Sequence, residues 1–248
     1  MSSVGIIAKY WNEEVLLPHW LKWLNLIDAR AIILADDGST DASAKICKAY
    51  THKSALVTNL SIDQQKREYF TETIPEAQKV NDLLAQAYDF GCDWVLHLDI
   101  DEFPTLPMIQ YINEELPRIP PNYGIYFPIC NMYKSLDEFI IRDLITNHPY
   151  YPEPHLKIFG KESGFVRTIN GMDLDQGVTG GNRYIMTSFP YIHLKYLFRF
   201  RRWMRYTSIE NQTRQPMGNF ATATFPKEII PKEIREWWME FKEPGHPW

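Results

Sequence analysis

Two aspartates after an apolar run are the residues of this chain whose types and spacing most directly suggest chemistry. Residues 94–98 have the composition of a buried strand, and Asp99 and Asp101 follow with Ile100 between them. Because side chains alternate along a strand, the pattern predicts that both carboxylates share one face. Neighbouring carboxylates repel unless a cation lies between them, and Mg²⁺ or Mn²⁺ takes oxygen ligands while keeping positions for phosphate oxygens. An acidic turn without a ligand is the alternative interpretation.

The first hundred residues predict the elements that must position these carboxylates. Short apolar runs alternate with helical patterns, which is typical of βαβ units and a mostly parallel central sheet flanked by helices. The expected strands are residues 4–8, 31–35, 56–60 and the run before Asp99. The expected helices are 15–26, a segment ending at 50 that Ser39, Thr40 or Asp41 can cap, and 76–90, closed by Gly91 in a left-handed conformation. Since parallel sheets bind ligands at the carboxyl ends of their strands, the loops that begin at Lys9, Asp36 and Asp99 are expected to converge.

The remainder of the chain is less regular. Residues 116–124 predict a loop, residues 125–129, 155–159 and 191–194 predict short strands, and the turn-rich residues 170–182 form either a lid or a surface loop. We expect an α/β fold with one domain over residues 1–225 and an irregular C-terminal tail over 226–248, where Trp237-Trp238 belong to an amphipathic segment.

Composition limits the function. The 248 residues are 45% hydrophobic, enough for a packed core, and the net charge of -5 argues against a nucleic-acid-binding protein. Three widely spaced cysteines predict free thiols in a reducing compartment. No signal-peptide pattern or long apolar segment is present, so the expected location is cytoplasmic, with peripheral membrane contact left open.

Several ordered pieces of the sequence resemble a known family. Asn12-Glu13-Glu14, then the stretch from Asp36 to Asp41, then Gln78 and Asn81 ahead of residues 94–103, resemble the nucleotide-sugar glycosyltransferases of the GT-A fold. The resemblance is to the family 2-like group with a D-x-D-E-F metal motif. It covers residues 4–103 and extends more weakly to 191–196. It implies a GT-A, Rossmann-like fold and metal-dependent transfer of a sugar, with inversion, from a nucleotide-sugar donor such as a UDP sugar to a glycan or lipid-linked acceptor, as in polysaccharide biosynthesis.

The same resemblance assigns roles to individual residues. Asp99, Asp101 and His193 would hold Mn²⁺ or Mg²⁺, although a purely structural role for His193 is the alternative. Asp37 matches the position that binds the nucleoside, with Asp36 as its neighbouring alternative. The other residues assigned to nucleotide binding are Asn12, Glu13, Gln78, Asn81 and Lys195.

The general base is less well marked. It must lie across the sugar from the metal, and Asp173 is our candidate, with Asp175 and Glu153 as alternatives. The sequence lacks the acidic pair that marks the base in many family 2 enzymes, which leaves the base and the stereochemical outcome open. The basic stretch over residues 195–206 is either a solvated face or a contact for the diphosphate, an anionic lipid or a phosphorylated acceptor.

Two other classes of function fit parts of the sequence. The 14 Tyr, 13 Phe and 8 Trp could stack on sugar rings in a non-catalytic carbohydrate-binding module, which would not need Asp99 and Asp101. A glycoside hydrolase would use two carboxylates on opposite sides of the scissile bond. Placement of both aspartates at one strand end favours shared ligation of a cation over opposed roles.

Overall fold

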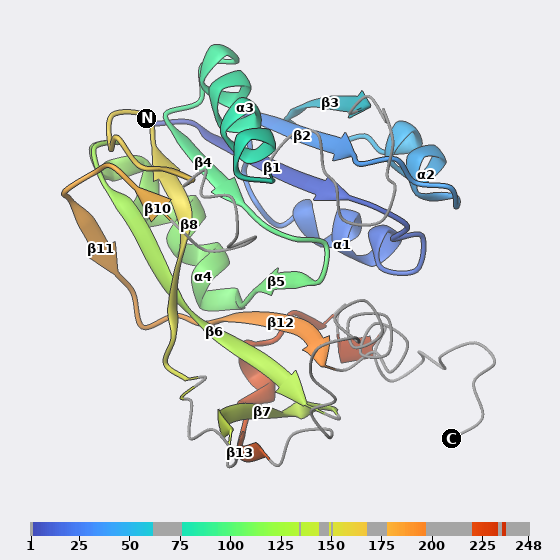
Figure 1. Ribbon diagram of the computed structural model, residues 1–248, viewed down its shortest axis with the longest axis vertical. Coiled ribbons are helices and arrows are strands. Elements are labelled where there is room, and N and C mark those ends of the chain that lie inside the picture. Colours follow the sequence, from blue (N-terminus) through green and yellow to red (C-terminus); the bar gives the residue numbers. More distant parts are fainter. Residues whose placement is uncertain are drawn as a thin grey trace. The chain divides into compact units, whose positions relative to one another are not determined.

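The structure is a computed structural model that describes residues 2–61, 76–133, 135–143, 149, 151–167, 178–196, 220–232 and 235–236 (Figure 1). The chain divides into two compact units. The first comprises residues 1–100, 109–127 and 155–187, and the second comprises 101–108, 128–154 and 188–248.

A parallel sheet forms the centre of the first unit. Its strands are β1 (Val4–Tyr10), β2 (Ala31–Asp36), β3 (Leu56–Ser61) and β4 (Trp94–His97), in the order β3-β2-β1-β4, and β8 (Pro154–Gly160) pairs antiparallel with β4. The predicted α/β class with a mostly parallel central sheet is confirmed. The predicted strands are confirmed too, each with slightly different ends.

Three helices connect the parallel strands: α1 (Leu17–Leu24), α2 (Ser43–Ala49) and α3 (Glu76–Asp89). The first is shorter than predicted. The N-cap residue of α2 is Ala42, so none of the expected capping residues holds that position. Asp41, directly before it, accepts a hydrogen bond at Oδ1 from the amide of Ser43 at 2.9 Å. Gly91 has the predicted left-handed backbone, with φ of 77°, which ends the chain's helical path after α3 at little steric cost.

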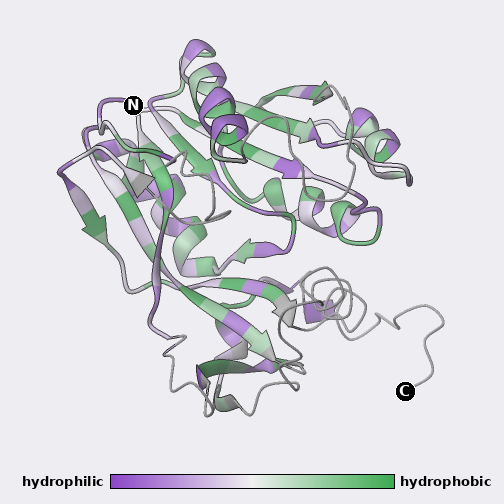
Figure 2. Ribbon diagram, in the orientation of Figure 1, coloured by the Kyte–Doolittle hydropathy of each residue, from purple (hydrophilic) through white to green (hydrophobic). Residues whose placement is uncertain are grey.

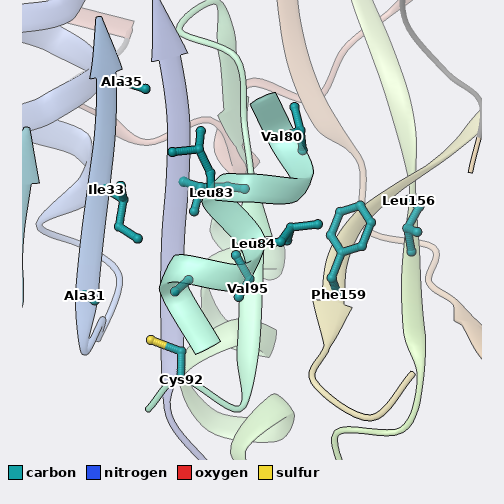
Figure 3. Packing of buried hydrophobic residues seen from close by; sticks show 12 residues of the cluster. Ala31, Ile33, Ala35, Val80, Leu83, Leu84, Cys92, Val95, Leu156 and Phe159 are labelled. Carbon is teal, nitrogen blue, oxygen red and sulfur yellow. The ribbon is translucent and has the colours of Figure 1, made fainter. Parts of the chain in front are cut away.

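The apolar face of α3 packs on one face of this sheet. Val80, Leu83 and Leu84 belong to one buried cluster with Val95 of β4 and Phe159 of β8, and Leu84 points toward the ring of Phe159 (Figure 3). Figure 2 shows hydrophilic and hydrophobic residues alternating along α3, as expected for a helix with one buried side. Full burial of one such side chain contributes about 1.5–3 kcal/mol, so this contact is a main source of stability for the unit.

The order of the strands creates a switch point. From β1 the chain moves outward to β2 and β3, and α3 then returns it to β4 on the other side of β1. In open α/β sheets, ligands bind beyond the carboxyl ends of the strands at such a reversal. The ends of β1 and β4 are therefore the position in this unit where the topology favours a ligand.

The first unit also contains elements that the sequence did not predict. Residues 111–115 form a π-helical turn, η1 (Tyr111–Glu115), and η2 (Leu116–Arg118) is a 3-10 turn inside the predicted loop, so that prediction was wrong for these residues. Strand β9 (Val166–Arg167) pairs with β10 (Val178–Thr179), and β11 (Tyr184–Met186) pairs with the start of β6 (Gly124–Tyr133).

The second unit is built mainly of strands. Strand β12 (Tyr191–Tyr196) pairs antiparallel with β5 (Glu102–Pro104) and parallel with the later residues of β6, while β7 (Ser135–Asp143) pairs with β6 and with β13 (Phe220–Thr224). Helix α4 (Leu106–Gln110) follows β5, and η3 (Lys227–Ile229) follows β13. The strands predicted in β6, β8 and β12 are confirmed, and each is longer than expected. Trp237-Trp238 lie outside the described residues.

Two further expectations concern the whole chain. Among the helices of the described residues, none has the length and apolar character needed to cross a bilayer. Cys47, Cys92 and Cys130 are free, as predicted, and all three are buried. Burial raises the pKa of the Cys47 thiol to about 12, so this thiol stays protonated at neutral pH.

Candidate active site

The loops after β1 and β2 are joined by hydrogen bonds. Asn12 has a left-handed backbone with φ of 52°, and its Oδ1 accepts a hydrogen bond from the amide of Thr40 at 2.8 Å. The amide of Asn12 donates to Ser39 Oγ at 3.0 Å, and the amide of Glu13 donates to Ser43 Oγ at 2.7 Å. The predicted convergence of these two loops is therefore present, and part of the hydrogen-bonding capacity of Asn12 is used to maintain it.

Asp36 and Asp37 have different surroundings. Asp36 Oδ1 accepts hydrogen bonds from the amides of Gly38 and Ser39 at 3.1 and 2.8 Å, which fixes the turn after β2. Asp37 instead accepts a hydrogen bond from Lys79 Nζ of α3 at 3.0 Å, and the side chains of Lys79 and Asp37 are only 7% and 14% exposed. No pattern in the sequence indicated Lys79 as a partner of Asp37, the aspartate predicted to bind the nucleoside.

Two amides on α3 were predicted to bind the nucleotide. Gln78 Nε2 donates to Asp82 Oδ1 at 2.7 Å, within the helix. Asn81 pairs with the main chain of Arg167: its Nδ2 donates to the carbonyl at 3.0 Å, and its Oδ1 accepts from the amide at 2.8 Å. Asn81 therefore holds β9 against α3.

His97 ends β4 and contacts the same arginine. The side chain of His97 is 6% exposed, and its Nδ1 lies 3.0 Å from Arg167 Nη2. Arginine can only donate, so Nδ1 accepts and the neutral ring carries its proton on Nε2. Burial and the charges of Arg167, Lys157 and Lys9 hold the pKa of His97 well below its usual range, while Asp99 acts in the opposite direction. The buried ring is therefore neutral.

The prediction that Asp99 and Asp101 share one face of a strand was wrong. Strand β4 ends at His97, and residues 100 and 101 form a turn that leads into β5. Alternation along a strand therefore does not apply to Asp99 and Asp101. Ile100 is buried as expected. Asp99 belongs to the first unit and Asp101 to the second.

His193 lies beside Asp101 in the second unit. Its Nε2 is 3.6 Å from Asp101 Oδ2, and Asp101 and His193 are 4% and 9% exposed. The Nδ1 of His193 lies 2.8 Å from Asn131 Oδ1, which can only accept, so Nδ1 carries a proton. In the neutral ring, Nε2 then presents a lone pair next to a carboxylate. A metal ion bound between the ring nitrogen and the carboxylate would have both as ligands.

The surroundings of Asp101 and His193 resemble part of a metal site. Metal-binding histidines usually donate their second ring N–H to an oxygen acceptor, as His193 does to Asn131. The carboxylate and imidazole suit Mn²⁺. Across the part of the chain that the structure describes, no group of three or more His, Cys, Asp or Glu side chains is placed to hold a metal ion. The two residues therefore fit part of a ligand set, and the roles of Asp99, Asp101 and His193 remain predictions.

The structure describes only some of the remaining predicted residues. Lys195 is in β12, but its side chain lies outside the described part of the structure. Asp173 and Asp175 lie outside the described residues, as does the basic stretch after Tyr196. Glu153 immediately precedes β8, and its carbonyl accepts a hydrogen bond from the amide of Ile129 at 3.1 Å.

Comparison with solved structures finds distant similarities. The crystal structure of S. aureus TarS has a TM-score of 0.48 and 16% identity, over 86% of this chain and 40% of that chain. A TarS structure of residues 1–349 has a TM-score of 0.45 and 16% identity, over 86% of this chain and 67% of that chain. This chain therefore spans less than half the length of the longer TarS chain.

A third structure comes from another organism. It is a glucosyl-3-phosphoglycerate synthase from Mycobacterium tuberculosis in complex with Mn²⁺, UDP and glucosyl-3-phosphoglycerate, with a TM-score of 0.43 and 16% identity over 91% of this chain and 88% of that chain. No family model and no curated protein matches the sequence. These low similarities leave function to be inferred from the residues of this chain.

Proposed function

We propose that this chain is a metal-dependent glycosyltransferase that moves a sugar from a nucleotide-sugar donor, a UDP sugar, to a hydroxyl acceptor. The observation that carries the proposal is the pair formed by Asp101 and His193. Both side chains are buried, Nε2 and Oδ2 lie 3.6 Å apart, and Asn131 fixes the ring so that its lone pair is next to the carboxylate. A bound cation would relieve the repulsion that this arrangement creates.

The proposed ligands are Asp101, His193 and, two residues earlier in the chain, Asp99. Mn²⁺ or Mg²⁺ held there would supply charge neutralisation for the departing diphosphate. Asp37 would accept hydrogen bonds from the base or ribose, and its contact with Lys79 at 3.0 Å would hold its carboxylate in position. Asn12 and Glu13 lie on the loop that is hydrogen-bonded to the one after β2, next to the proposed nucleoside position.

Transfer then needs a base. The acceptor oxygen forms a bond to the anomeric carbon as the bond from that carbon to the diphosphate oxygen breaks, and a carboxylate takes the hydroxyl proton. Asp173 is the proposed base, with Asp175 and Glu153 as alternatives. A base on the side opposite the leaving group would give inversion.

Calorimetry tests the proposal. Wild-type protein is titrated with UDP in Mn²⁺ and again in EDTA, and Asp101→Asn is compared with Glu138→Gln, which removes one charge from an exposed residue of β7. We expect binding that requires Mn²⁺, is at least about tenfold weaker in Asp101→Asn and is unchanged in Glu138→Gln. Equal UDP affinity in EDTA and in Mn²⁺ would contradict the metal-dependent mechanism.

The same protein distinguishes the other classes of function. A carbohydrate-binding module would bind glycans without nucleotide and without metal. A glycoside hydrolase would cleave a glycan in EDTA. Either result, in the absence of UDP binding, would replace the glycosyltransferase proposal.

A further inference from the structure

Basic side chains gather at one end of the sheet face that α3 covers. The core beneath α3 includes Ile7 of β1, Val95 of β4, and Leu156 and Phe159 of β8. Two positions along their strands from Ile7, Val95 and Phe159 lie Lys9, His97 and Lys157. All three lie toward the carboxyl ends of the parallel strands, at the switch point between β1 and β4. The chain as a whole carries a net charge of -5, so this local group of basic residues, two of them lysines, does not follow from the overall composition.

Arg167 completes this group from β9. Its guanidinium lies over the ring of Phe159, with Cζ 5.6 Å from the centroid, and Nη2 donates to His97 at 3.0 Å. Asn81 holds its main chain through two hydrogen bonds. The guanidinium is thus fixed in position by an aromatic face, an imidazole and a backbone anchor. Among the described residues, no carboxylate forms an ion pair with it.

Two buried donors at this place have no acceptor among the described residues. One is the Nε of Arg167, and the other is the Nε2 of His97, which carries the proton of the neutral ring. Buried N–H groups without acceptors are rare in proteins, and they often indicate a ligand that supplies one. An acceptor-rich anion would satisfy both donors.

A phosphate group is the ligand that fits this chemistry. It presents several acceptor oxygens and a negative charge, and the planar fork of arginine binds such oxygens with two parallel hydrogen bonds. We propose that Arg167, positioned by His97 and Asn81, binds a phosphate group of the substrate, with Lys9 and Lys157 contributing charge. This inference extends the proposed nucleotide-sugar function: the phosphate belongs either to the donor diphosphate or to a phosphorylated acceptor.

Inorganic phosphate is the probe, titrated calorimetrically into the full chain. Arg167→Gln removes the charge and the fork, Arg167→Lys keeps the charge alone, and Arg118→Gln removes one charge from a side chain that is 73% exposed. We expect phosphate affinity to fall at least about tenfold in Arg167→Gln, to be intermediate in Arg167→Lys and to be unchanged in Arg118→Gln. The Lys variant shows whether lost binding reflects the missing fork or a disrupted unit.

A second titration identifies the source of the phosphate group. If UDP and Mn²⁺ at saturation abolish phosphate binding, Arg167 binds the donor diphosphate, and if phosphate still binds, the site belongs to the acceptor. Absence of phosphate binding in the wild type, or equal binding in Arg167→Gln, would overturn the inference. Because the first titration uses phosphate without metal, it can succeed even when UDP binding fails to depend on Mn²⁺, so the two proposals fail separately.

Discussion

Lys79 Nζ on α3 donates a hydrogen bond to Oδ1 of Asp37, which directly follows β2, at a distance of 3.0 Å. Both side chains are largely buried. The contact joins two residues 42 positions apart. It ties the helix that covers the sheet to the proposed nucleoside site, so the fold of the unit and the orientation of this carboxylate depend on each other.

The losses of stability caused by replacing Lys79 and by replacing Asp37 should not add. Lys79→Met leaves the carboxylate of Asp37 buried without this cation, and we expect a loss of about 3 kcal/mol in the free energy of unfolding. The double variant Lys79→Met, Asp37→Leu should lose less than the sum of the single variants. Urea unfolding gives the free energy of unfolding of the wild type, the two single variants and the double variant. Strict additivity of the losses would show that the two residues are not coupled.

Asn131 should control metal affinity without touching the metal. Asn131→Leu removes the acceptor for Nδ1 of His193 and releases the ring orientation. We expect Mn²⁺ to bind about tenfold or more weakly, as for other losses of an outer-shell hydrogen bond. Electron paramagnetic resonance of free Mn²⁺ provides the measurement, and Asn122→Leu in the first unit serves as a control. An unchanged Mn²⁺ affinity would mean that Asn131 does not support a metal ligand.

His52 should make stability depend on pH. Its Nδ1 accepts hydrogen bonds from the amides of Ser54 and Ala55 at 3.3 and 3.0 Å, and burial holds its pKa below 6.5. Between the folded-state pKa and 6.5 the unfolded chain binds more protons, so the free energy of unfolding falls as the pH drops through this window. His52→Asn cannot titrate there and keeps an acceptor.

Urea unfolding at pH 7.5 and 5.5 checks this sign. The wild type should lose more stability between the two values than His52→Asn does, because the other histidines remain in both proteins. An equal loss in both proteins would remove His52 as a contributor.

Gly5 of β1 should be replaceable only with a change at Cys92. A Cβ at Gly5 would lie 2.8 Å from Cys92 Sγ, closer than two such atoms approach. Gly5→Ala should therefore cost about 1–3 kcal/mol through overpacking. Adding Cys92→Ala removes the sulfur, so the double variant should unfold at a higher temperature than the Gly5→Ala protein. If the second change only adds to the loss, the close contact is not the cause.

Local patterns predicted the elements of the first unit well. Strands β1 to β4 and helix α3 follow from runs and periodicities within a few residues, and the left-handed Gly91 follows from its residue type. The same method misplaced the end of β4, because Leu98 continues the apolar run after the strand has ended at His97. A buried side chain is apolar whether or not its backbone is in a strand, so the sequence could not show where the turn begins.

Local sequence patterns could not predict which residues of the candidate site contact one another. His97 and Arg167 are 70 residues apart, and no spacing rule relates β4 to the two-residue strand β9. Lys79 offered a weak signal, since it is four residues before the buried Leu83 on α3, but a lysine in a helix is usually a solvated residue. Only the order of the strands brings these side chains together.

The three buried cysteines allow local unfolding of the protein to be followed by thiol alkylation. A thiol-specific reagent attacks the thiolate, and Cys47, Cys92 and Cys130 reach solvent only when their surroundings unfold. Two of these sulfur atoms belong to the first unit and one to the second. Mass spectrometry of partly alkylated protein would therefore record whether the two units open together or one after the other, without any introduced label.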